Sequence, residues 1–109
     1  MISDKDVEAA VDYLRDNAKK AAEAKGNHIY MDEYRKVVKA ALMREKLGET
    51  LGAQESYAYS APRYTEHLEV YREAAKVDEY HRWMMKAAEA KIEVWRTQAA
   101  NERALGKLG

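Results

Sequence analysis

Apolar residues recur along this chain at the three- and four-residue spacing of helices that bury one side. Within the first 25 residues this repeat comprises Val7, Val11, Leu14, Ala18, Ala21 and Ala22. Ser3 precedes the repeat as a good N-cap, and Gly26-Asn27 follows it with residues that readily end a helix. The pattern therefore predicts a first helix from Ser3 to about Lys25.

A second helix is predicted from about Asp32 to Leu47, with Gly48 ending it. Its apolar side comprises Tyr34, Val37, Val38, Ala41 and Leu42. Residues 48–60 contain Gly52 and show little periodicity. We expect a loop there, with at most one short helical turn.

The third predicted segment is long. Ser60 is placed to cap it, and Pro62 falls in the first turn, where a missing N–H does no harm. No glycine or proline occurs from Arg63 to Leu105, and strong helix formers dominate this stretch. Propensity alone thus predicts one helix of roughly 40 residues, far above the usual length.

The apolar pattern changes phase within this segment, near Asp78. One apolar set comprises Tyr64, Leu68, Tyr71 and Ala75, and a second comprises Val77, Met84, Ala88, Ile92, Trp95 and Ala99. At about 100° per residue the two sets point in nearly opposite directions. Two structures fit: a hairpin broken near Asp78, or one unbroken helix whose second half packs on another chain. We favour the unbroken helix, because no residue there breaks it.

Taken together, the elements predict an all-α protein: a small helical bundle with a long C-terminal helix, forming one domain over residues 1–109. No apolar stretch approaches the roughly 20 residues that cross a bilayer. The polar N-terminus is unlike a secretory signal. Cysteine is absent, which excludes disulfides and suits a reducing compartment. We therefore expect a cytoplasmic protein without a membrane partner.

Charge and aromatic content indicate which kinds of partner the chain can bind. Lys plus Arg equals Asp plus Glu, 19 each, so the basic excess typical of nucleic-acid-binding proteins is missing. A net charge near zero lowers the repulsion between copies and permits self-association. The chain has 8 Tyr and 2 Trp but no Phe. Tyr and Trp are favoured at half-wet surfaces and interfaces.

No pattern of catalytic or metal-binding residues stands out. The histidines are His28, His67 and His81, and only Asp78 and His81 share the spacing of a carboxylate–histidine motif, without a second copy. No Gly-x-Ser-x-Gly pattern supports a nucleophile at Ser56 or Ser60. We expect a protein that is not an enzyme and that binds no metal or cofactor.

Two surfaces are candidates for binding another molecule. The first is a candidate protein interface for self-association or an unknown protein partner, comprising Val77, Trp83, Met84, Ala88, Ile92, Trp95 and Ala99. Such a broad Trp- and Met-rich surface indicates either a central helix or an intermolecular contact.

The second surface points to nucleic acid. It combines a candidate recognition loop, Tyr57, Tyr59, Arg63 and Tyr64, with a candidate basic patch, Arg35, Lys36 and Lys39. Tyrosine and arginine can stack on unpaired bases. Because the overall charge is balanced, we expect nucleic-acid binding through this surface to be weak.

Two short segments, Lys91-Ile92-Glu93-Val94-Trp95-Arg96-Thr97-Gln98 and Met43-Arg44-Glu45-Lys46-Leu47-Gly48, resemble parts of small helical proteins from tailed phages and prophages. The resemblance covers roughly the second half of the chain and contains no catalytic motif. It implies a phage accessory protein acting in the cytoplasm of the bacterial host. Together with the candidate protein interface, it leads us to expect a non-enzymatic protein that acts through protein–protein contacts as a homodimer. Since some such proteins are encoded among replication or recombination genes, a nucleic-acid-associated accessory factor is the alternative.

Overall fold

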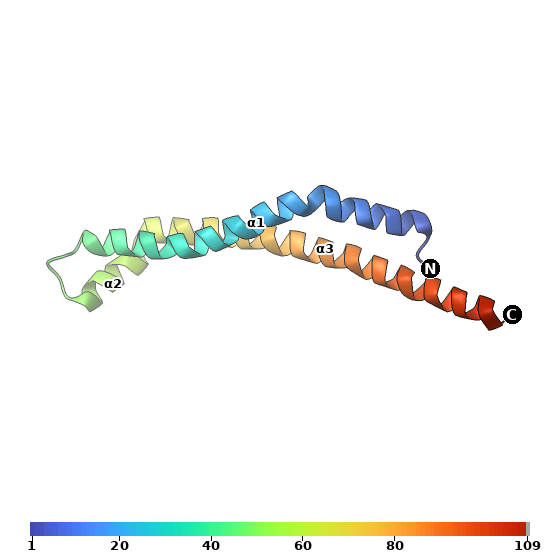
Figure 1. Cartoon of the computed structure of the whole chain (residues 1–109). Coiled ribbons are helices and arrows are strands. Elements are labelled where there is room, and N and C mark those ends of the chain that lie inside the picture. The colour runs from blue at the N-terminus through green and yellow to red at the C-terminus, as the bar shows by residue number, and fades with distance from the viewer. Residues whose placement is uncertain (109) are drawn as a thin grey trace. The chain divides into compact units, whose positions relative to one another are not determined.

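The computed structural model describes residues 1–108, which form three helices and no strand (Figure 1). They are α1 (Asp4–Arg44), α2 (Leu51–Ser60) and α3 (Pro62–Leu108). The predicted all-α fold with a long C-terminal helix is confirmed. Within this part of the chain, no helix combines the length and the apolar character that a membrane span requires.

α1 begins at the predicted cap. The backbone N–H of Asp6 donates to Ser3 Oγ at 3.1 Å, and the N–H of Ser3 donates to Asp6 Oδ2 at 3.0 Å. This reciprocal pair satisfies two N–H groups that the helix start would leave without partners. The hydrogen bond from the Ser3 N–H also lowers the pKa of the Asp6 carboxyl group, because it favours the ionised form.

α1 continues through Gly26, so the prediction that a helix ends at Gly26-Asn27 was wrong. The predicted helices 3–25 and 32–47 are one helix. No glycine in the described chain has a positive φ, so Gly26 does not take the left-handed conformation of a C-cap. A glycine in a helix interior costs only about 1 kcal/mol. That cost is too small to break a helix whose neighbouring turns pack against α3.

The predicted loop over residues 48–60 was also wrong, because most of it forms α2. Thr50 caps α2 by accepting the N–H of Ala53 on its Oγ1 at 3.2 Å, and Gly52 is tolerated in the first turn. Ser60 does not cap α3; its hydroxyl donates to the carbonyl of Ser56 at 2.7 Å. Ala61 separates the two helices instead. Pro62 lies in the first turn of α3, as predicted, but is its first residue, so α3 begins two residues later than expected.

The chain contains two compact units: unit 1 comprises residues 1–21 and 80–109, and unit 2 comprises residues 22–79. In unit 1 the start of α1 packs antiparallel to the second half of α3. The Trp95 indole N–H donates to Asp4 at 2.9 Å, and the Ile2 N–H donates to Gln98 at 3.3 Å. Buried and half-buried positions recur in steps of three and four residues along both helices. These positions, here called the unit 1 seam, are Val7, Ala10, Leu14, Asn17 and Ala21 on α1 and His81, Met85, Ala88, Ile92, Trp95 and Ala99 on α3.

Unit 2 holds a small hydrophobic core. α2 folds back beside the last turns of α1 (Figure 1), and the core comprises Val38, Leu42, Ala58, Ala61 and Tyr64. Met43 and Tyr57 pack against it. Outside this core, buried and half-buried positions again recur in steps of three and four residues. These positions, here called the unit 2 seam, are Ala24, His28, Met31 and Arg35 on α1 and His67, Tyr71, Ala74 and Asp78 on α3.

α3 is one unbroken helix, as we favoured, but the predicted phase change was wrong. Its buried positions run through Tyr71, Ala74, Asp78, His81 and Met85 in steps of three and four residues. The two opposite apolar sets arose because the polar residues Asp78 and His81 occupy positions that were expected to be apolar. The stripe predicted for the first helix was wrong in part for the same reason. Its members Val11, Ala18 and Ala22 are exposed, whereas Asn17 lies in the seam.

Gly26→Ala is expected to stabilise the protein. Gly26 is exposed in a helix interior, its φ is not positive, and an added Cβ would meet no atom within 4 Å. The free energy of unfolding should therefore rise by about 1 kcal/mol in urea denaturation. The reverse change at a matched exposed position, Ala22→Gly, should lower it by a similar amount. A loss of stability in Gly26→Ala would show that this glycine is needed for its conformation.

Leu42→Ala is expected to lower the free energy of unfolding by roughly 2–5 kcal/mol, because it opens a cavity in the only cluster of buried apolar side chains in residues 1–108. Leu42 is 3% exposed, whereas Leu47 is 72% exposed and serves as the matched control. Thermal or urea unfolding should show Leu47→Ala within about 0.5 kcal/mol of the parent. Equal effects of the two substitutions would contradict the position of this core.

Candidate protein interaction surface

The seven residues predicted as one protein interface do not share one side of α3. Ala88, Ile92, Trp95 and Ala99 are buried or half-buried within unit 1, on the side that faces α1. Trp83 and Met84 are exposed on other sides of the helix. Val77 belongs to unit 2, where it lines an open groove of about 450 Å³. The surface available to another molecule is therefore only part of the predicted set.

Five of the exposed apolar residues of α3 in unit 1 form a regular pattern of their own. Trp83 and the seam residue Met85 point to nearly opposite sides, since each residue turns a helix by about 100°. On the Trp83 side an exposed line, here called the outer stripe, comprises Tyr80, Trp83, Ala87, Ala90 and Val94. Its successive steps are three, four, three and four residues. This is the spacing of a helix side that packs against another helix.

Aromatic side chains dominate the start of the outer stripe. Tyr80 is 59% exposed and Trp83 is 58% exposed. The Arg82 guanidinium carbon lies 5.3 Å from the Trp83 ring centroid, and Lys86 Nζ lies 4.9 Å from it. These contacts between the cations and the indole favour this orientation of the Trp83 ring. An exposed tryptophan that is already oriented loses little entropy on binding, which favours its use as a contact residue.

Sequence reasoning identified Trp83 as an interface residue but missed Tyr80, Ala87, Ala90 and Val94. The signal that could have found them is that α3 carries two lines of residues with three- and four-residue spacing. The line of the outer stripe can be recognised only after the other line has been assigned to the side that faces α1. Two alanines and one valine are weak apolar signals by themselves. Their meaning comes from sharing one side of the helix with Tyr80 and Trp83.

The candidate recognition residues lie on helices rather than on a loop. Tyr64 is buried in the unit 2 core, and Tyr57 packs against that core. The Tyr57 hydroxyl donates to Glu45 at 2.6 Å, and this hydrogen bond raises the pKa of Tyr57. Tyr59 and Arg63 remain exposed. Two of the four residues thus anchor the structure, and two are accessible.

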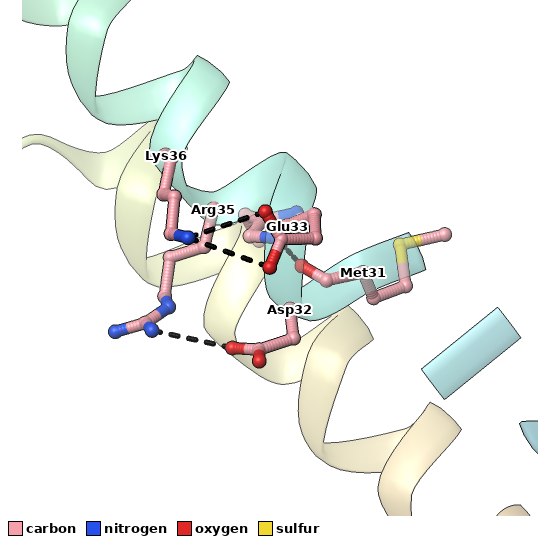
Figure 2. A network of polar contacts seen from close by, with 6 residues as sticks. Met31, Asp32, Glu33, Arg35 and Lys36 are labelled. Carbon is pink, nitrogen blue, oxygen red and sulfur yellow. Dashed lines mark hydrogen bonds and ion pairs between the residues drawn. The ribbon is translucent and has the colours of Figure 1, made fainter. Parts of the chain in front are cut away.

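Each cation of the predicted basic patch has an acidic partner. Figure 2 shows Arg35 paired with Asp32 and Lys36 paired with Glu33. The N···O distance is 3.2 Å in both pairs. Lys39 Nζ lies 3.6 Å from Glu55 and 4.7 Å from the Tyr59 ring centroid. Hydrogen bonding to the Tyr64 and Tyr59 hydroxyls, with the nearby carboxylates, raises the pKa of Arg35 and of Lys39, respectively. The patch therefore carries little unbalanced positive charge.

His28 forms a long-range polar contact between the two long helices of unit 2. Its Nδ1 lies 2.7 Å from Asp78 Oδ2, and both side chains are largely covered. The rings of His28 and Tyr71 pack in a T-shaped arrangement, with centroids 5.5 Å apart. A carboxylate in the seam requires a donor opposite it, because an unpaired buried charge is costly. The pair therefore helps to fix how α1 and α3 align within this unit.

The other two histidines also lie in the seams. His67 Nε2 donates to the carbonyl of Met31 at 2.8 Å, which makes Nε2 the protonated nitrogen. His81 Nδ1 is buried without a hydrogen-bond partner. Across residues 1–108, no three His, Asp or Glu side chains are grouped so that they could hold a metal ion. All three histidines therefore lie where α1 and α3 pack against each other.

Comparison with protein families, with curated proteins and with solved structures found no match to this chain.

Asp78→Ala is expected to lower the free energy of unfolding by about 2 kcal/mol, since it leaves His28 without its charged partner. The control is Asp12→Ala, which removes an exposed ion pair with Arg15 and should cost less than about 1 kcal/mol. Replacing both partners, as in His28→Leu/Asp78→Leu, should recover most of the loss. An Asp78→Ala effect as small as that of Asp12→Ala would show that the pair contributes nothing to stability.

Proposed function

We propose that this chain is a non-enzymatic interaction protein that self-associates as a homodimer, and that the outer stripe of α3 is the surface it uses. The observation that carries the proposal is the exposed heptad line of Tyr80, Trp83, Ala87, Ala90 and Val94. A stripe of this spacing is typical of helices that pack against a further helix. Tyr and Trp are common among residues that contribute most to binding.

The sparse interior of the chain supports the same proposal. No large side chain among residues 1–108 is fully buried. Several seam positions hold alanine, among them Ala10, Ala24, Ala74 and Ala88. An alanine buries far less apolar surface than a leucine. Each alanine layer, meaning a level of the seam at which α1 or α3 contributes an alanine, therefore adds little stability. A second chain on the outer stripe would add apolar burial that one chain lacks, and the formal net charge of zero leaves little repulsion between copies.

The cellular setting in this proposal rests on the resemblance to small phage proteins. It makes the chain an accessory protein that acts in the cytoplasm of a bacterial host through protein contacts. The nucleic-acid alternative gains no comparable support. Its cations Arg35, Lys36 and Lys39 are paired with carboxylates, and Tyr57 and Tyr64 are used in packing.

Sedimentation equilibrium tests self-association. We expect a dimer of twice the 12.5 kDa chain mass at high micromolar concentration. Trp83→Ala should raise the dimer Kd at least tenfold, because the dimer buries two copies of this contact residue. Val11→Ala, at an exposed apolar position of α1 in the same unit, should leave the Kd unchanged. A parent chain that stays monomeric at several hundred micromolar would refute the proposal.

A further inference from the structure

We propose that the occupant of the outer stripe is the same stripe of a second copy in antiparallel orientation, in one register selected by Lys86 and Glu93. This inference rests on the proposed self-association and adds its geometry. The stripe residues and the pair that selects the register lie in α3 of unit 1, between positions 80 and 97, and Glu79 directly precedes them in the same helix. The argument combines the spacing of the stripe with the charges that flank it.

The outer stripe defines the heptad positions of α3. Tyr80, Ala87 and Val94 recur every seven residues, and so do Trp83, Ala90 and Thr97. When two such helices pack antiparallel, residues of the first set lie opposite residues of the second set. Centring the pair between positions 88 and 89 places Ala87 opposite Ala90, Trp83 opposite Val94, and Tyr80 opposite Thr97. The small residues then meet at the centre, and each large aromatic ring packs beside a smaller side chain.

The residues that flank the stripe select this arrangement. On one flank the seven-residue repeat is Glu79, Lys86 and Glu93; on the other it includes Met84 and Lys91. In the centred antiparallel register, Lys86 lies beside Glu93 of the second copy, and the symmetry produces this pair twice. Lys91 lies beside Met84 of the second copy and can cover it with its aliphatic chain.

The alternative arrangements bring like charges together. Sliding the second copy by one heptad in one direction places Lys86 beside Lys86 and Glu79 beside Glu93. Sliding it in the other direction places Glu93 beside Glu93. A parallel pair places Lys86 beside Lys91. Like charges at these flanking positions are destabilising, so the flanks disfavour all three alternatives.

Charge exchange at the flank tests both orientation and register. By sedimentation equilibrium at low salt, Lys86→Glu and Glu93→Lys should each raise the dimer Kd about tenfold, because each puts two like-charged pairs in place of two attractive ones. The double variant Lys86→Glu/Glu93→Lys should restore the Kd to within about threefold of the parent. The single changes also remove the Lys86–Trp83 contact or the Glu93–Arg96 ion pair. The double variant lacks both, so its recovery has to come from the intermolecular pairs.

Lys5→Glu and Glu8→Lys are the matched controls, since they make the same changes in net charge at exposed positions of α1 in the same unit. They should leave the Kd within about twofold of the parent, and circular dichroism should show unchanged helicity in every variant. Tighter binding by Lys86→Glu would indicate the parallel pair and overturn the inference. The inference would also be overturned if the single variants weaken the dimer and the double variant does not restore the Kd, or if none of the three variants changes the Kd. Either result would leave the proposed self-association intact. A monomeric parent chain would reject both proposals.

Discussion

The three- and four-residue alternation of buried positions governs both long helices. A straight helix has 3.6 residues per turn, so a 3.5-residue repeat stays on one side only when the helix is slightly underwound against its partner. Once α3 follows this repeat on the side of His81 and Met85, its opposite side inherits the same period. The outer stripe of Tyr80, Trp83 and Val94 is therefore aligned along the helix as the seam is, and a third helix of the same kind can follow it.

Polar residues in the seams contribute alignment more than hydrophobic stability. Alanine layers such as Ala24 and Ala74 pack almost equally well in several alignments, because a methyl group has no directional partner. Asp78 is different, since its carboxylate needs the His28 ring at hydrogen-bond distance. A buried polar group that finds its partner in one alignment only makes the others unfavourable. The seam of unit 2 thereby gains a defined alignment despite its small side chains.

The sequence was sufficient to predict the helical class, the cap at Ser3 and the position of Pro62 in the first turn of α3, and it favoured an unbroken helix past Asp78 over a hairpin. These features depend on local propensity and on the absence of helix-breaking residues. It was insufficient at Gly26, where helix packing on both sides outweighs a local cost of about 1 kcal/mol.

The candidate surface could be predicted only in part, for a different reason. Trp83 stands out by its residue type, whereas Ala87 and Ala90 gain significance only after the side facing α1 is known. That side was misassigned because a search for apolar residues passes over Asp78 and His81. The pairing of His28 with Asp78, 50 residues apart, leaves no local pattern in the sequence.

The clustering of buried side chains around Leu42 and Tyr64 has a consequence for how the molecule opens. Backbone amides exchange their hydrogens with solvent when the local structure unfolds, and the free energy of that opening follows the density of packed side chains. Within unit 2, the amides near Val38 and Leu42 should therefore exchange last. Those near Gly26, where a flexible glycine adjoins an alanine layer, should exchange much sooner. The alanine layers thus mark where each long helix opens to solvent first.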